Sequence, residues 1–89
     1  MTSHLTADFI SCFRKLPVRI QRVARKNYKI WKDNPEHPGL QFKLVGLRKP
    51  VFSIRAGVGY RALGLRVDDG IVWFWIGSHG EYERLISQL

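Results

Sequence analysis

The spacing of hydrophobic positions divides the chain into a helical part and a strand part. Up to Lys32 the apolar side chains recur every three or four residues, which is the period of an amphipathic helix. The segment 34–39 contains two prolines and a glycine, so it cannot continue a helix. After Gly39 apolar and polar residues tend to alternate, and this period of two indicates strands. The pattern therefore predicts an α+β fold that begins with helices.

The helical part predicts two helices that form an antiparallel hairpin around Leu16 and Pro17. Thr6 suits the N-cap of the first helix, because its hydroxyl can accept a bond from a free backbone N–H. Pro17 suits the first turn of the second helix, where a missing N–H costs nothing. The apolar face of the first helix comprises Ala7, Phe9, Ile10, Phe13 and Leu16, and that of the second comprises Ile20, Val23, Ala24, Asn27, Tyr28 and Trp31.

The strand part predicts four antiparallel strands, rich in Val, Ile, Phe, Tyr and Trp. These strands are expected near 41–47, 51–56, 60–67 and 71–77, and the first of them has the weakest pattern and could pair elsewhere. Ser78 and Glu81 have the spacing of a capping box, so a short helix should follow them. The expected architecture is a helical hairpin packed mainly on one face of a four-stranded antiparallel sheet, with a short C-terminal helix.

Turn residues set the expected register of the last two strands. The Asp-Gly dipeptide at 69–70 is a strong signal for a two-residue hairpin turn. This turn would place Trp75 opposite Gly64, where a large ring packs over a missing side chain, and Trp73 opposite Arg66. We therefore interpret both tryptophans first as core residues and only second as residues that stack on bases.

The turn at 57–59 places two arginines close together. With three residues in this turn, Arg55 lies directly opposite Arg61, and like charges in such a position repel each other. Either each arginine has a partner of its own, or both bind one anion such as a phosphate. The small number of acidic residues favours the shared anion.

His79 and Tyr82 stand three residues apart at the start of the last expected helix, so they share a face. Histidine suits proton transfer near neutral pH, and tyrosine can orient a proton. Each could instead be an ordinary cap or core residue. The expected pairing of Arg61 with Ser78 would bring both residues beside Arg55, so we expect a single site here.

Composition narrows the class of protein. The chain has 89 residues, 45% hydrophobic residues and a net charge of +8, with an isoelectric point near 10.3. This excludes a disordered chain, and a charge of that size usually matches a polyanionic partner. The single Cys12 excludes a disulfide framework and fits a reducing cytosol, and no apolar run approaches the roughly 20 residues of a membrane span. We expect one soluble, cytoplasmic domain over 1–89, with no membrane partner.

Motifs for cofactors and metals are missing from the sequence, so we expect neither. There is no phosphate-binding glycine loop, the three histidines match no zinc spacing, and the seven acidic residues are scattered. The basic residues form a group on the second helix, which we interpret first as a solvated face, and a group on and between the strands. The helix group comprises Arg19, Arg22, Arg25, Lys26, Lys29 and Lys32, and the strand group comprises Lys43, Arg48, Lys49, Arg55, Arg61 and Arg66.

Several segments, taken in order, resemble the RelE/ParE superfamily, the toxins of bacterial type II toxin–antitoxin systems. The helical hairpin resembles the opening of the family, and residues 34–46 resemble its connection to the sheet. Residues 52–64 resemble its pair of strands with two arginines, and 71–79 with Tyr82 resemble its closing segment. The resemblance covers nearly the whole chain.

The resemblance implies a toxin that is held silent by a cognate antitoxin encoded beside it. Family members that act on RNA cut mRNA without a metal, usually in the ribosomal decoding site. It therefore implies an endoribonuclease, or mRNA interferase, that inhibits translation. For this reaction we assign Arg55 and Arg61 to the phosphate and Tyr82 to orienting the nucleotide. His79 is assigned to proton transfer from its chemistry, in the place of a lysine, and Lys43, Arg48 and Lys49 are expected to bind the RNA.

Departures from the family pattern leave alternatives open. Some ribosome-dependent relatives carry lysines on the strand before the paired arginines, whereas the same face here has Val51 and Ser53. Other members bind DNA gyrase without cutting RNA, and a decayed toxin would only bind its antitoxin. The net charge also predicts the chemistry of the partner, which is an acidic antitoxin segment that folds across the second helix or the sheet groove.

Overall fold

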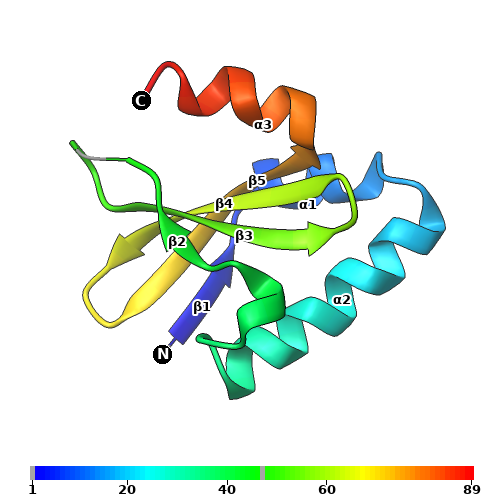
Figure 1. Ribbon diagram of the computed structural model, residues 1–89, viewed down its shortest axis with the longest axis horizontal. Coiled ribbons are helices and arrows are strands. Elements are labelled where there is room, and N and C mark those ends of the chain that lie inside the picture. Colours follow the sequence, from blue (N-terminus) through cyan, green and yellow to red (C-terminus); the bar gives the residue numbers. More distant parts are fainter. Residues whose placement is uncertain (1, 47) are drawn as a thin grey trace.

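The computed structural model describes residues 2–46 and 48–89, which form three α-helices, one 3-10 helix and five strands (Figure 1). In chain order these are β1 (Thr2–Leu5), α1 (Ala7–Arg14), α2 (Val18–Asp33), η1 (Pro38–Leu40), β2 (Lys43–Leu44), β3 (Val51–Gly57), β4 (Tyr60–Val67), β5 (Gly70–Ser78) and α3 (His79–Ile86). The strands form one sheet in the order β1-β5-β4-β3-β2. The expected α+β architecture is confirmed, with five strands in these residues rather than four.

Strand β1 is the strand that the sequence pattern does not predict. It pairs in parallel with β5, and Thr2 lies opposite Gly70. Three of its four residues are exposed, so it lacks the alternation that marks a half-buried strand. Gly70 permits the close approach, because a Cβ atom there would stand 2.9 Å from the carbonyl oxygen of Thr2.

The strand expected at 41–47 is much shorter in the structure. Only Lys43–Leu44 is a strand, and it pairs antiparallel with β3 at the edge of the sheet. Gln41 precedes it with φ of 49°, a left-handed conformation that ends η1 and interrupts an extended chain. The last residue of the expected strand, Leu47, lies outside the described residues.

The helix ends follow the sequence signals closely. The Thr6 hydroxyl accepts a hydrogen bond from the Phe9 N–H at 3.0 Å, as expected of an N-cap. Pro17 is the N-cap of α2, one position before the first turn that the sequence suggests. The capping box of α3 is present, with Ser78 and Glu81 bonded to each other's backbone N–H groups.

The sheet carries helices on both faces. Ala62 of β4 packs in one core cluster with Ala24 and Trp31 of α2, whereas the next residue, Leu63, packs in a second cluster with Tyr82 of α3. Successive side chains of a strand point to opposite faces, so α2 and α3 lie on opposite sides of the sheet. Figure 1 shows α3 (orange to red) apart from α1 and α2 (blue to cyan). The helical hairpin therefore packs on one face of the sheet, as expected, whereas α3 packs on the other face.

The turn between β4 and β5 lies one residue earlier than the expected Asp-Gly dipeptide. Val67 pairs with Gly70, so Asp68 and Asp69 form the turn, and Asp68 has φ of 47°. Aspartate tolerates this left-handed conformation better than most residues do, which explains why glycine is not needed at that position.

This shift overturns three expected pairings. Trp73, not Trp75, lies opposite Gly64, and after an irregularity between Leu63 and Gly64 the partner of Trp75 is Leu63. Arg61 pairs with Gly77 instead of Ser78. The interpretation of Trp73 as a core residue is confirmed, since only 2% of its surface is exposed.

Candidate functional site

The two arginines predicted to face each other do so. Arg55 on β3 and Arg61 on β4 are Cα partners, although the hairpin reaches this register differently from the expected three-residue turn. Gly57 pairs with Tyr60, and an irregularity between Arg55 and Gly57 accommodates the extra residue Ala56. The register thus places two positive charges side by side near one end of the sheet.

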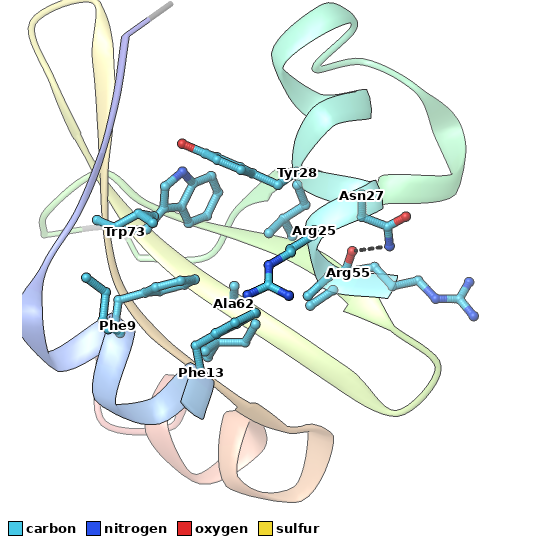
Figure 2. A pocket seen from close by; sticks show the side chains of 14 residues that line it. Phe9, Phe13, Arg25, Asn27, Tyr28, Arg55, Ala62 and Trp73 are labelled. Carbon is cyan, nitrogen blue, oxygen red and sulfur yellow. Dashed lines mark hydrogen bonds between the residues drawn. The ribbon is translucent and has the colours of Figure 1, made fainter. Parts of the chain in front are cut away.

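The side chains of the two arginines have different surroundings. Arg61 is buried, with 4% of its surface exposed, whereas Arg55 is half-buried. The carbonyl oxygen of Arg55 accepts a hydrogen bond from Asn27 Nδ2 at 3.2 Å, and Figure 2 shows its guanidinium extending away from α2. The structure therefore has one buried cation and one more accessible cation at this pair.

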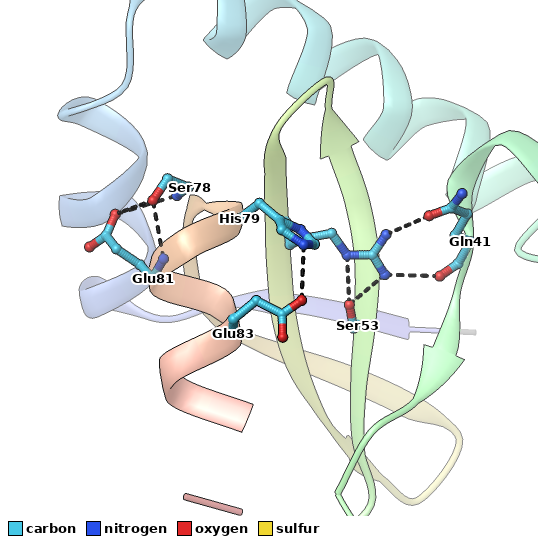
Figure 3. A network of polar contacts seen from close by, with 7 residues as sticks. Gln41, Ser53, Ser78, His79, Glu81 and Glu83 are labelled. Carbon is cyan, nitrogen blue, oxygen red and sulfur yellow. Dashed lines mark hydrogen bonds and ion pairs between the residues drawn. The ribbon is translucent and has the colours of Figure 1, made fainter. Parts of the chain in front are cut away.

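Four contacts hold the guanidinium of Arg61. Its Nε donates to Ser53 Oγ at 2.9 Å, and one Nη donates to the same oxygen at 2.5 Å and to the carbonyl oxygen of Gln41 at 3.1 Å. The other Nη donates to Gln41 Oε1 at 3.0 Å. Figure 3 shows these contacts to Ser53 and Gln41 as dashed lines. All of the acceptors are neutral.

The charge of Arg61 is not compensated by an acid. Among residues 2–46 and 48–89 no carboxylate forms an ion pair with it. Burial lowers the pKa of the Arg61 guanidinium, and the nearby charge of Arg55 lowers it further, while Tyr82 acts in the opposite direction. An arginine remains protonated despite such a shift, so the site holds a buried positive charge.

Helix α3 brings Tyr82 and His79 to this charge. The ring of Tyr82, buried at 3% exposure, lies beneath the Arg61 guanidinium at 5.3 Å, and the rings of His79 and Tyr82 are 5.6 Å apart. The backbone N–H of His79 donates to the carbonyl oxygen of Gly59 at 2.8 Å, which ties the start of α3 to the turn before β4. The expected proximity of Arg61, Tyr82 and His79 is therefore present in the structure.

His79 has a carboxylate partner on the same helix. Its Nε2 lies 2.9 Å from Oε1 of Glu83, one turn further along α3, and both side chains are 57% exposed. A carboxylate in this position fixes the orientation of the imidazole and leaves Nδ1 free to exchange a proton. His79 thus has the arrangement of an oriented acid–base group at the surface.

The remaining expected site residues lie on β2 and in the loop that follows it. Lys43 is exposed and is the Cα partner of Ser53, so an exposed cation stands one strand away from the Arg61 contacts. Arg48 and Lys49 are exposed in the loop between β2 and β3. The structure records no contact of these three cations with Arg61, Tyr82 or His79.

Sequence reasoning missed three residues of the site as contacts. Glu83 could have been found, because it stands four residues after His79 on a helix. The pattern places Ser53 on the same strand face as Val51 but does not indicate its hydrogen bond to Arg61. Gln41 gives no sequence signal, since its contact depends on a left-handed turn 20 residues before Arg61.

A hollow lies between α1, α2 and the sheet, on the face opposite α3 (Figure 2). Its volume is about 330 Å³ and its walls are almost entirely apolar, with Phe9 and Phe13 on one side and Tyr28 and Trp73 on the other. The guanidinium of Arg25 lies 5.1 Å from the ring centre of Phe13 and lines this cleft. We call it the hairpin cleft.

The described residues contain no candidate metal centre. Within 2–46 and 48–89 no three His, Cys, Asp or Glu side chains gather into a group that would hold a metal ion. No helix in the same ranges has both the length and the apolar run needed to cross a membrane.

The helical hairpin, the sheet order and α3 together define a RelE-like α+β fold. The isolated RelE toxin of E. coli is similar to this chain with a TM-score of 0.64 and 17% identity, over 98% of this chain and 97% of that chain. A copper-bound mutant toxin from Helicobacter pylori is similar with a TM-score of 0.63 and 18% identity, over 91% and 97% of the two chains. No protein-family model and no curated protein sequence matches the chain. These two structural similarities confirm the expected RelE-like fold.

Proposed function

We propose that this protein is the toxin of a type II toxin–antitoxin system and that it cuts RNA. The observation that carries the proposal is the buried, acid-free cation of Arg61, which lies over Tyr82 beside the His79–Glu83 pair in a RelE-like fold. Burying a charge without a counter-charge costs several kcal/mol, on the order of the cost of a broken buried ion pair. Such costly charges cluster at functional sites, where a ligand supplies the missing counter-charge.

The chemistry that suits these groups is cleavage of an RNA strand by its own ribose. The 2′-oxygen attacks the adjacent phosphorus and the bond to the 5′-oxygen breaks, which leaves a 2′,3′-cyclic phosphate and a free 5′-hydroxyl. His79 Nδ1 takes the proton of the 2′-hydroxyl while Nε2 stays bonded to Glu83. Water protonates the leaving 5′-oxygen, and the hydroxide that remains takes the proton back from His79, which regenerates the neutral imidazole. Arg61 stabilises the charge that develops on the phosphate, and Arg55 adds to the positive field. Tyr82 orients the nucleotide.

The exposed cations of β2 and its loop suit the RNA backbone. Lys43 lies beside Ser53, and Arg48 and Lys49 follow in the loop, so together they extend the positive surface away from Arg61. Lysine and arginine contacts to phosphates add affinity without reading bases. The substrate class that we propose is single-stranded RNA, including mRNA on a ribosome.

The proposed protein partner is an acidic antitoxin segment. The hairpin cleft is almost entirely apolar, Arg25 of α2 lines it, and Nζ of Lys32 lies 4.9 Å from the ring centre of Tyr28, another lining residue. A segment with apolar side chains for the cleft and acidic side chains for these two cations would match both properties. Such a partner would also mask part of the +8 charge that draws the toxin to RNA.

The test is to incubate purified protein with mRNA, with and without translating ribosomes, and to map the new 5′ ends. Cleavage in either reaction supports the proposal and shows whether the ribosome is needed. A gyrase supercoiling assay with the same preparation tests the alternative target. Inhibition of gyrase without any RNA cleavage would replace the proposed activity, and antitoxin binding alone would indicate a decayed toxin.

A further inference from the structure

The acceptors around Arg61 are neutral, whereas an ordinary buried ion pair would provide a carboxylate. A guanidinium has five N–H bonds, and the four contacts to Ser53 and Gln41 leave one N–H of Nη unused. Ser53 is fully buried on β3, whereas Gln41 is an exposed loop residue that adopts a left-handed conformation. That conformation directs both its carbonyl and its side-chain oxygen to the same guanidinium.

A neutral acceptor and a carboxylate would affect Arg61 differently. Both fix the direction of the N–H bonds, but a carboxylate also cancels the positive charge. A hydroxyl, an amide and a peptide carbonyl leave that charge available for an incoming anion. Gln41 and Ser53 differ in burial and lie 12 positions apart in the chain, but both fix the guanidinium of Arg61 without cancelling its charge.

We propose that Gln41 and Ser53 are positioning residues that hold Arg61 as an uncompensated cation for a phosphate group of RNA. This inference rests on the proposed function, since it specifies how that site binds its substrate. The phosphate accepts a hydrogen bond from the remaining N–H of Arg61 and supplies the counter-charge that the residues described by the structure do not. Gln41 acts through Arg61 and not on the reacting atoms.

The substitution Gln41→Glu keeps the positioning of the Arg61 guanidinium but cancels its charge, because glutamate has the shape of glutamine and adds one negative charge. It would keep the contact to Nη and form an ion pair with Arg61, so the melting temperature should stay equal or rise. Affinity for a non-cleavable oligonucleotide, in which the 2′-hydroxyls are replaced by hydrogen, should fall at least tenfold. Gln41→Ala removes the contact but not the charge of the site, so its affinity should fall less.

Gln88→Glu is the matched control, because it makes the same change in net charge at an exposed position near the opposite end of α3 from His79. It should bind the oligonucleotide within twofold of the wild type. A second readout is the NMR signal of the Arg61 Nε–H during titration with inorganic phosphate. That signal should shift in the wild type and in Gln88→Glu, and stay unchanged in Gln41→Glu.

The inference is tested by which of the two Gln41 variants binds the oligonucleotide more weakly. A weaker affinity for Gln41→Glu than for Gln41→Ala, with both proteins folded, supports the inference. Equal affinities for the two variants, or a greater loss for Gln41→Ala, would overturn it and assign Gln41 a structural role. If phosphate binding follows the expected order but the wild type cuts no RNA, the inference stands and the proposed nuclease activity fails.

Discussion

The indole ring of Trp73 lies over Gly64, its partner on the neighbouring strand. A Cβ atom on Gly64 would stand 2.7 Å from Cε3 of Trp73, a distance that real Cβ atoms essentially never show. The same ring meets Trp31 of α2 edge-on, with the ring centres 5.3 Å apart. The missing side chain at position 64 thus lets one tryptophan connect the sheet to the helical hairpin.

Gly64→Ala should therefore destabilise the protein. Overpacking a filled core costs about 1–3 kcal/mol, because Ile71, whose Cγ2 lies nearest to the added Cβ, and the ring of Trp73 must both leave their preferred positions. Equilibrium unfolding in denaturant measures the loss. Gly80→Ala on α3 is the control, since its Cβ would meet nothing within 4 Å and a helical alanine is up to about 1 kcal/mol more favourable than glycine. Equal stabilities for the two variants would show that Ile71 and Trp73 do not need the space.

Arg61→Ala should abolish growth arrest in cells that express the protein. Loss of one cation that stabilises a transition state typically lowers the rate by about a hundredfold to a thousandfold. Arg61→Lys should rescue little of the rate, because an ammonium group cannot occupy the fork between Ser53 and Gln41. Circular dichroism shows whether each variant is folded. Full toxicity of a folded Arg61→Ala protein would reject Arg61 as a catalytic residue.

Changes to His79 and Glu83 should separate proton transfer from orientation. We expect His79→Ala to lower kcat for RNA cleavage by about a hundredfold or more with little change in KM, since it removes the proton-transfer group. Glu83→Gln should lower kcat by a smaller factor, because the amide still accepts a hydrogen bond from Nε2. Glu36→Gln, in the exposed segment after α2, serves as the control for the lost charge. A normal kcat for His79→Ala would assign proton transfer to another group.

Association with an acidic antitoxin segment should be steered by the charge of α2. Arg25→Glu reverses a charge at the hairpin cleft and should slow association, most strongly at low salt. Arg84→Glu on α3 makes the same change away from the cleft and should slow it less. Stopped-flow rates over a range of ionic strengths measure both effects. A rate that is indifferent to salt would contradict electrostatic steering.

The sequence predicts local features of this fold well. The helix caps, the capping box of α3 and the pairing of Arg55 with Arg61 depend on residues that are close in the chain. The Asp-Gly dipeptide predicts the turn before β5 one residue too late, because Asp68 itself adopts the left-handed conformation that glycine adopts most readily. The shifted turn, together with the irregularity between Leu63 and Gly64, gives Trp73 and Trp75 other partners than the expected ones.

The features that the sequence does not predict depend on contacts between residues far apart in the chain. Strand β1 exists because it pairs with β5, about 70 residues away in the chain, and its own residues carry no strand pattern. The contact of Gln41 with Arg61 likewise depends on how the loop after η1 folds over β3 and β4. The same limit applies to the placement of α3, since its apolar residues do not indicate which face of the sheet they cover.

The most direct test of the proposed activity is to determine the chemical ends of RNA after incubation with the purified protein. We expect fragments that carry a 2′,3′-cyclic phosphate and a 5′-hydroxyl with the wild type, and intact RNA with folded Arg61→Ala and His79→Ala. Ends of another chemistry, or the same fragments from all three proteins, would contradict a reaction carried out by Arg61 and His79.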